Sequence, residues 1–284
     1  ARAGMTLHVL EPNLLAAPGS LLNRAGEPFK VFTPFHRALL QRPVAAPVPS
    51  PARMADPGQG VRSLSLEELG LLPRHDWAGG LRESWTPGEK GAQRKMSLFL
   101  DGAVGGYPEG RDTPSIRGTS RLSPHLHFGE ISARALLHET ALRAEAAGGA
   151  GMVRGAEAWV RQLHWREFAQ HLLWHMPRLA NDPMRAEFSV FPWEEDGALL
   201  QAWRRGRTGY PMVDAGMREL WHTGWMHNRV RMIAASFLVK HLLQHWRTGA
   251  AWFAGTLVDA DLANNMLGWQ WTAGCGPDAA PYFR

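Results

Sequence analysis

The sequence predicts a mostly α-helical protein, and two long segments carry most of that prediction. In residues 157–176, EAWVRQLHWREFAQHLLWHM, polar and aromatic side chains recur at spacings of three and four, so that Trp159, Gln162 and Arg166 share one helical face. Residues 210–246 repeat this periodicity in two helices with a Thr-Gly break between them. We therefore expect nearly all α structure over the C-terminal two-thirds of the chain.

The N-terminal part has a different pattern. Residues 5–10, MTLHVL, have the composition of a short strand, and a single strand needs partners, so we expect residues 1–16 to be the tail of a preceding sheet-containing domain. A proline-rich stretch then favours extended structure. We predict an interdomain linker over 17–88 and a helical domain over 89–284, whose C-terminal end is truncated.

Composition excludes several classes of protein. The 284 residues carry a formal net charge of +5, which permits a nucleic-acid partner without requiring one. Cys275 is the single cysteine, so this chain cannot form an internal disulfide or an all-cysteine metal site, and the histidines lack a zinc-ligand spacing. No apolar run approaches the ~20 residues that span a membrane. We expect a cytoplasmic protein without a metal.

Tryptophans and hydroxyl groups mark two further features. Eleven of the thirteen tryptophans lie between Trp159 and Trp271, where they could form an aromatic core or stacking platforms. The segment GTSRLSPHLHFGEIS places Ser123 before a proline, a pattern that fits a helix N-cap with proline in the first turn. This helix start is either an ordinary cap or a cradle for a diphosphate.

Five segments together resemble the photolyase/cryptochrome family, in order and at matching spacings. They are GTSRLSPHLHFGEIS, QLHWREF, GYPMVDAGMRELWHTGWMHNRVRMIAASFLVK, DADLANNMLGWQW and DAAPYFR. The resemblance covers roughly residues 100–284. It implies an all-helical FAD-binding domain, preceded by the remnant of an α/β antenna domain.

The resemblance also implies a set of cofactor contacts. Asn265 matches the position that faces flavin N5, and Arg231 with Asp259 matches a pair beside the flavin, although without the family context a structural ion pair is the simpler interpretation. Hydroxyls and amides near residue 120 would hold the diphosphate. The whole expected set is Tyr107, Thr119, Ser120, Leu122, Ser123, Trp159, Arg166, Trp225, Arg231, Asp259, Asp261 and Asn265.

Substrate contacts and an electron relay follow from the same resemblance. A flipped-out pyrimidine dimer would lie between Trp165 and Trp271. Asn228 would form hydrogen bonds with its bases, and Met232 would pack on them. Gln162 stands where repair enzymes for these dimers typically carry glutamate. The expected phosphate contacts are Arg111, Arg229 and Arg284, and the expected relay from flavin to surface is Trp269, Trp246 and Trp193.

The leading functional hypothesis is light-driven repair of cyclobutane pyrimidine dimers in ultraviolet-damaged DNA by a monomeric enzyme. A cryptochrome-type signalling flavoprotein is the alternative from another class. Enzymes that repair (6-4) photoproducts carry a histidine pair at the positions of Asn228 and Met232, which this sequence lacks. A basic helical protein with a tryptophan-rich core is the fourth interpretation. A longer form could bind a second, antenna chromophore, whose identity the sequence leaves open.

Overall fold

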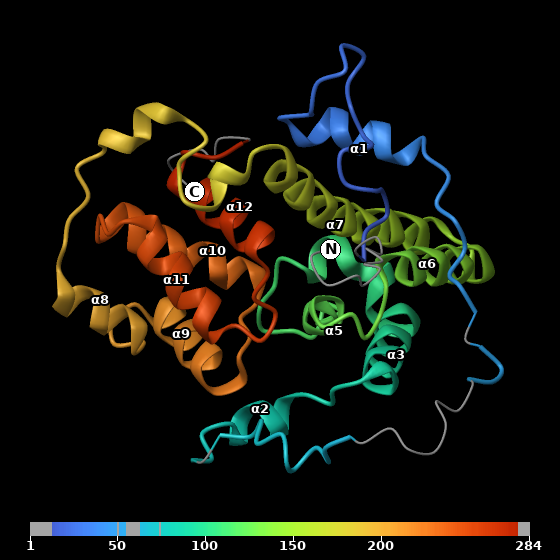
Figure 1. Ribbon diagram of the computed structural model, residues 1–284, viewed down its shortest axis with the longest axis horizontal. Helices are drawn as coiled ribbons and strands as arrows, with labels where there is room; N and C mark the ends of the chain where they lie inside the picture. The colour runs from blue at the N-terminus through green and yellow to red at the C-terminus, as the bar shows by residue number, and fades with distance from the viewer. Residues whose placement is uncertain (1–12, 50, 55–62, 74, 278–284) are drawn as a thin grey trace.

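The computed structural model describes residues 13–49, 51–54, 63–73 and 75–277, and most of these residues are helical (Figure 1). No strand occurs in these ranges, where the only β pairing consists of the isolated bridges Leu22–Pro28 and Glu194–Gln244. The prediction of a mostly α protein is confirmed. The strand expected at residues 5–10 lies outside the described residues.

Several helices of the N-terminal half pack against one long central helix, α7 (Ala150–His175). Its residue Gly155 contacts the backbone so closely that an added Cβ would lie 1.9 Å from the carbonyl oxygen of Val104. This close approach lets α7 pass directly against the segment before α4. The helices of this half are α1 (Phe32–Leu40), α2 (Gly79–Ser84), α3 (Glu89–Leu98), η1 (Phe99–Ala103), η2 (Val104–Gly106), α4 (Tyr107–Gly110), α5 (Ser123–His127), α6 (Ala133–Ala147) and α7 (Ala150–His175).

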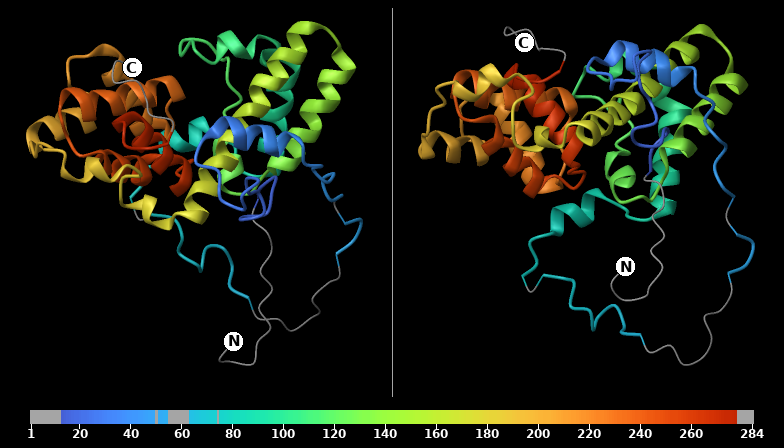
Figure 2. Two further views of the ribbon diagram at one scale, coloured as in Figure 1. Left: turned by 90° about the horizontal axis from the view of Figure 1, so that it is seen from above. Right: turned by 45° about the horizontal axis from the view of Figure 1, so that its top comes forward.

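A second group of helices lies beside the first (Figure 2). Each group has its own apolar core, and α12 contributes to both, with Met266 in the first core and Trp269 in the second. α12 therefore joins the two halves along α7. The elements of the second group are η3 (Pro177–Ala180), η4 (Ala186–Val190), α8 (Gly197–Arg204), α9 (Pro211–Thr223), α10 (Asn228–Ser236), η5 (Phe237–His241), α11 (Trp246–Thr256) and α12 (Leu262–Ala273).

Part of the range 17–88 belongs to the helical body. The α1 side chains Phe32 and Phe35 are 1% and 2% exposed, and α1 lies across α7 in Figure 1. Residues 43–49 then have no regular structure, as the prolines favour. The division into a sheet-domain tail, a linker and a helical domain stays a prediction, but α1 is packed rather than extended.

The break predicted between two helices near residue 223 is present. α9 ends at Thr223, and Gly224 has φ +67°, a left-handed conformation that glycine adopts without steric cost. The second helix is shorter than expected, because α10 passes at Phe237 into a single π-helical turn and the chain leaves the helix before Trp246 begins α11. This geometry brings the start of α10 close to α12.

Candidate active site

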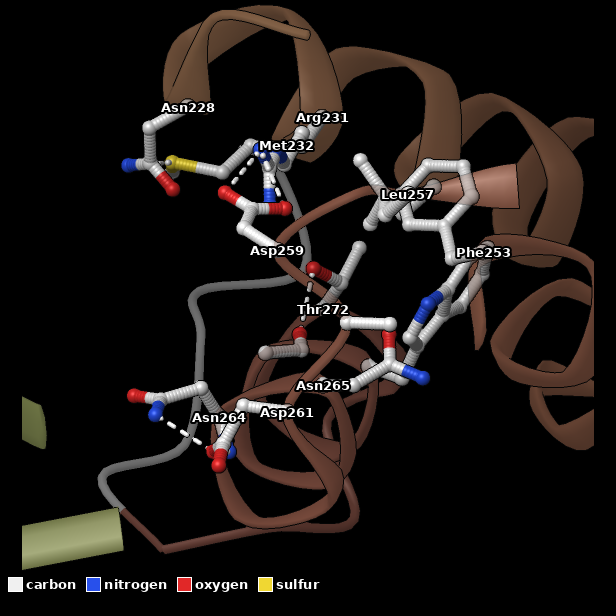
Figure 3. A pocket seen from close by; sticks show the side chains of 14 residues that line it. Asn228, Arg231, Met232, Phe253, Leu257, Asp259, Asp261, Asn264, Asn265 and Thr272 are labelled. Carbon is white, nitrogen blue, oxygen red and sulfur yellow. Dashed lines mark hydrogen bonds and ion pairs between the residues drawn. The ribbon is translucent and has the colours of Figure 1, made fainter. Parts of the chain in front are cut away.

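A cavity of about 200 Å³ lies where α10, α11 and α12 meet the loop between α11 and α12 (Figure 3). Its wall combines carboxylates, amides and one guanidinium with apolar side chains, which is the composition of a site that orients a polar ligand. The lining residues are Asn228, Arg231, Met232, Ala235, Phe253, Leu257, Asp259, Ala260, Asp261, Asn264, Asn265, Gly268, Trp269 and Thr272.

Arg231 and Asp259 form an ion pair on this wall, as Figure 3 shows. The Nη2 atom of Arg231 lies 2.8 Å and 3.1 Å from the two carboxylate oxygens of Asp259, and its Nε donates to the carbonyl of Met226 at 2.8 Å. The Asp259 side chain is only 3% exposed. The buried charge of Asp259 is thereby compensated by the half-buried Arg231, and the pair supplies a fixed dipole to the cavity.

The first turns of α12 place three predicted residues at the cavity. Asp261 is the N-cap, since its carboxylate accepts from the backbone N–H of Asn264 at 2.8 Å. One turn later Asn265 donates from Nδ2 to the carbonyl of Ala250 at 2.9 Å, which fixes its amide and leaves the carbonyl oxygen for a ligand. Trp269 follows one turn further along, with a buried Nε1–H that has no partner among the described residues. The spacing of four puts all three on one face.

The segment before α5 differs in detail from the prediction. Ser123 is the first residue of the helix rather than its N-cap, which is Leu122, and Pro124 is therefore the second residue. The hydroxyl of Ser120 accepts from the backbone N–H of Leu122 at 3.3 Å, so Ser120 rather than Ser123 satisfies a backbone donor at this turn. Thr119 is half-buried beside it. None of these residues lines the cavity described above.

Arg121, a residue that the sequence motifs did not single out, is the unusual member of this segment. Its φ of +52° is rare for a residue with a side chain, and its guanidinium lies 4.2 Å from the ring of Trp225 and 5.4 Å from the ring of Trp85. The Nε of Arg121 is buried without a described hydrogen-bond partner. The signal available in the sequence was its place within the motif TSRLS.

Tyr107 and Trp159 lie together in the first half of the molecule. Their ring centroids are 5.8 Å apart in an edge-to-face arrangement, and Phe99 completes the group. Burial raises the pKa of the Tyr107 hydroxyl. The indole Nε1–H of Trp159 is buried and has no described partner, a condition that native proteins rarely leave unsatisfied.

Three predicted residues of α7 make contacts outside the lining of the cavity. Trp165 stacks on Phe32 of α1 with centroids 3.6 Å apart, and Gln162 donates to the carbonyl of Ala158 on its own helix at 3.0 Å. Arg166 donates to the carbonyl of Asn13 at 2.7 Å. None of the three lines the cavity, and Trp271 on α12 does not either.

Two of the predicted phosphate contacts share one carboxylate. Arg229 pairs with Asp112 through Nε at 2.7 Å and Nη2 at 2.6 Å, while Nε of Arg111 lies 3.6 Å from the same oxygen. Asp112 was not predicted, because a pair separated by 117 positions leaves no local pattern. The third predicted contact, Arg284, lies outside the described residues.

The three residues of the predicted relay differ in burial and in position relative to the cavity. Trp269 lines the cavity, Trp246 is buried at the start of α11, and Trp193 is half-buried in the loop after η4. The ring of His245 bridges the last two, with centroids 5.7 Å from Trp246 and 5.1 Å from Trp193. Aromatic rings are thus in contact along the outer part of the route.

The described residues hold neither a membrane span nor a cluster of metal ligands. None of their helices combines the length and the apolarity that crossing a membrane requires. Within the same ranges, no group of three or more histidine, cysteine or acidic side chains is placed to hold a metal ion.

Comparisons with known proteins identify the family. Residues 159–284 match the FAD binding domain of DNA photolyase. A curated relative from Agrobacterium fabrum, named deoxyribodipyrimidine photo-lyase, is 47% identical over 283 residues, which make up 99% of this chain and 58% of the relative. The chain therefore spans somewhat less than two thirds of that relative's length.

Solved structures agree with this result. The crystal structure of a bacterial class III photolyase from Agrobacterium tumefaciens superposes with a TM-score of 0.90 at 47% identity, over 96% of this chain and 56% of that one. A cryptochrome from Synechocystis superposes with a TM-score of 0.77 at 27% identity, over 95% of this chain and 56% of that one. The chain thus carries the FAD-binding domain of the DNA photolyase family, as its motifs predict.

The described residues fit the FAD that this domain is named for. The cavity offers a guanidinium–carboxylate pair and a fixed amide, and two buried indole N–H groups, on Trp159 and Trp269, have no described partner. The volume of about 200 Å³ is below the ~300–1,000 Å³ of typical ligand pockets, so the cavity matches a part of such a ligand rather than the whole.

Proposed function

We propose that this protein repairs cyclobutane pyrimidine dimers in DNA by a light-driven reaction that uses FAD. One observation carries the proposal. A single cavity wall bears the Arg231–Asp259 pair and Asn265, which suit a flavin, together with Asn228 and Met232, which suit a base. The activity of relatives named deoxyribodipyrimidine photo-lyase supports the same conclusion.

In this proposal the cofactor is held by charge, amides and aromatic rings. Reduced FAD held here would supply light-driven electron transfer, the chemistry that opening the dimer needs. Arg231 favours a negatively charged flavin, since a guanidinium in a poorly hydrated site stabilises an adjacent anion. Asn265, whose Nδ2 is engaged by the carbonyl of Ala250, would have its carbonyl oxygen available to the flavin. The hydroxyls and amides of residues 119–123 bind the diphosphate, and Tyr107, Trp159, Arg166, Trp225 and Asp261 complete the site.

The lesion reaches this cavity by leaving the duplex. Photolyases are among the enzymes that flip their target base out of the stack, and a damaged pair costs less to extrude because it is already poorly stacked. Asn228, which is exposed in the first turn of α10, forms a hydrogen bond with a base edge, and Met232 packs against the bases. Trp165 and Trp271 are proposed to flank the dimer, for which Trp165 has the ring face opposite Phe32.

The remaining expectations are part of the same proposal. Phosphate groups on either side of the lesion contact Arg111, Arg229 and Arg284. The enzyme acts as a monomer in the cytoplasm on ultraviolet-damaged DNA. An antenna chromophore in a longer form of the protein is compatible with the proposal, and nothing in the cavity requires it.

Two rival functions differ in specific residues. Repair of (6-4) photoproducts would use a histidine pair, whereas this cavity presents Asn228 and Met232. A cryptochrome would need the flavin site and the relay, but it has no need for a base contact at the cavity mouth. The polar Asn228 beside the sulfur of Met232 at 3.7 Å therefore favours repair.

The test mixes protein whose bound FAD has been reduced with oligonucleotides that contain either a thymine dimer or a (6-4) lesion, illuminates the mixture, and measures restored thymines. We expect restored thymines from the dimer alone. Asn228→Ala should weaken binding of the dimer by about 1–3 kcal/mol, because a base contact is lost in a partly buried site. Gln162→Glu should change the yield only modestly. Repair of the (6-4) lesion alone, or of neither lesion by fully reduced protein, would contradict the proposal.

A further inference from the structure

Asp112 connects two arginines that come from different parts of the molecule. It follows Arg111 after the short helix α4, and its carboxylate reaches Arg229 in the first turn of α10, 117 positions away. Its Oδ1 lies 2.7 Å from Nε and 2.6 Å from Nη2 of Arg229, and 3.6 Å from Nε of Arg111. The Asp112 side chain is 54% exposed, so the group lies at the surface beside the cavity mouth.

The contacts of Arg229 leave it a defined binding capacity. A guanidinium has five N–H donors. Nε and one N–H of Nη2 face Asp112, and one N–H of Nη1 faces the sulfur of Met232 at 3.3 Å. Two donors, one on each terminal nitrogen, have no acceptor among the described residues and suit a further one. Because Asn228 and Met232 line the cavity, these donors are fixed next to the place where a lesion would enter.

We propose that Asp112 is a positioning residue for DNA binding: it holds the guanidiniums of Arg229 and Arg111 in place to meet the phosphates that flank the lesion. The inference rests on the proposed function. It extends that function by assigning a role to an acidic residue whose charge alone would oppose binding of DNA.

Two effects of Asp112 on DNA affinity have opposite signs, and this makes the inference testable. Its negative charge repels phosphate and neutralises part of the arginine charge, so its removal would tighten binding on electrostatic grounds. The contacts of Asp112 also order the long, flexible side chain of Arg229 before DNA binds. Without Asp112, the conformational entropy of Arg229 would be lost during binding, and the affinity for DNA would fall. Screening reduces the first effect at this exposed position. We therefore expect ordering to outweigh repulsion.

Asp101→Asn is the matched control. Asp101 lies in η1, its side chain is 58% exposed, and it forms an ion pair with Arg143 of α6 through one terminal nitrogen, whereas Asp112 contacts two nitrogens of Arg229. Asp101→Asn therefore changes the net charge by the same amount as Asp112→Asn. It also frees one arginine, Arg143, but at a site outside the cavity wall. Only Asp112 holds arginines that are proposed to contact phosphate.

The experiment measures dissociation constants of FAD-loaded wild type, Asp112→Asn and Asp101→Asn for duplexes with and without a thymine dimer, over a range of salt. Asp112→Asn should bind both duplexes about fivefold more weakly than wild type, whereas Asp101→Asn should bind equally well or slightly more tightly. The repair rate at saturating DNA should be unchanged in Asp112→Asn, with only the half-saturating concentration raised. In an Arg229→Ala background most of the Asp112→Asn effect should disappear.

Equal or tighter binding by Asp112→Asn, or the same change in Asp101→Asn, would overturn the inference. If Asp112→Asn folds poorly, Asp112→Glu, which keeps the charge but moves the carboxylate outward by one methylene, should also weaken binding, and wild-type affinity in that variant would count against positioning. Failure of the proposed function looks different. In that case wild-type protein would show no preference for the dimer and no repair, whatever the Asp112 variants do.

Discussion

At the scale of single residues, the contact between α11 and α12 depends on the absence of one side chain. A Cβ on Gly249 would lie 2.1 Å from Cη2 of Trp269 and 2.6 Å from Cδ2 of Leu238. Trp269 cannot move aside, because its ring is 2% exposed and packs against Phe253 at 5.0 Å. Glycine is required here for space, and the close approach sets the position of the indole at the cavity wall.

Gly249→Ala should therefore destabilise the protein by about 1–3 kcal/mol, the usual cost of overpacking a core, as measured by urea unfolding. Gly255→Ala is the matched control, because that glycine lies on the same helix with no atom within 4 Å of an added Cβ. The control should be neutral or slightly stabilising, since alanine favours a helix over glycine by up to about 1 kcal/mol. Equal stability of the two variants would show that α11 and α12 are less tightly packed than described.

At the scale of elements, one buried carboxyl fastens the N-terminal segment to α7. Glu167 accepts from the backbone N–H groups of Leu15 and Ala16 at 2.8 Å and 3.4 Å, and Arg166 lies 3.3 Å away. Burial nevertheless dominates over these contacts and raises the pKa of Glu167 from 4.5 to about 7. The folded protein should keep this carboxyl protonated well above the pH at which the unfolded chain releases its proton.

This shift predicts a pH dependence with a definite sign. Between pH 4.5 and about 7 the folded state binds the extra proton, so the stabilisation from Glu167 is full below pH 4.5 and is lost as pH rises through about 7. Buried histidines act oppositely, since burial lowers the pKa of His164 to about 4. Glu167→Gln keeps an acceptor for Leu15 and removes the titration.

Urea unfolding at a series of pH values isolates the effect. The difference in unfolding free energy between wild type and Glu167→Gln should change by at most about 1.4 kcal/mol per pH unit, with wild type losing stability relative to the variant as pH rises. A constant difference across this range would mean that Glu167 is already ionised in the folded protein.

Local pattern explains which elements and site residues could be predicted from the sequence. The α9 break was visible because periodicity stops at a glycine, and Asp261, Asn265 and Trp269 were predicted because they lie in the motif DADLANNMLGWQW, which resembles the photolyase/cryptochrome family. Pairings between distant segments left no such pattern. The stacking of Trp165 on Phe32 and the hydrogen bond that Arg229 donates to Asp112 join positions more than one hundred residues apart, so only the folded chain reveals them.

At the scale of the whole molecule, the three tryptophans of the proposed relay come from separate parts of the fold. Trp269 on α12 lies at the cavity, and Trp246 is the first residue of α11. Trp193 belongs to the loop whose next residue, Glu194, forms a parallel bridge with Gln244, shortly after η5. Three separate elements must pack together before these rings can form a route. Reduction of a bound flavin by light would therefore test the tertiary arrangement as well as the identity of each residue.

Trp246→Phe is expected to leave FAD binding intact and to slow photoreduction of oxidised flavin severely, because phenylalanine fills much of the buried volume but is far harder to oxidise than an indole. The measurement is the loss of oxidised-flavin absorbance under blue light with an external reductant. Trp174→Phe provides the control, since Trp174 is 61% exposed and lies outside the proposed route. Wild-type photoreduction in Trp246→Phe would show that electrons reach the flavin by another path, and equal slowing in Trp174→Phe would point to a general effect of losing an indole.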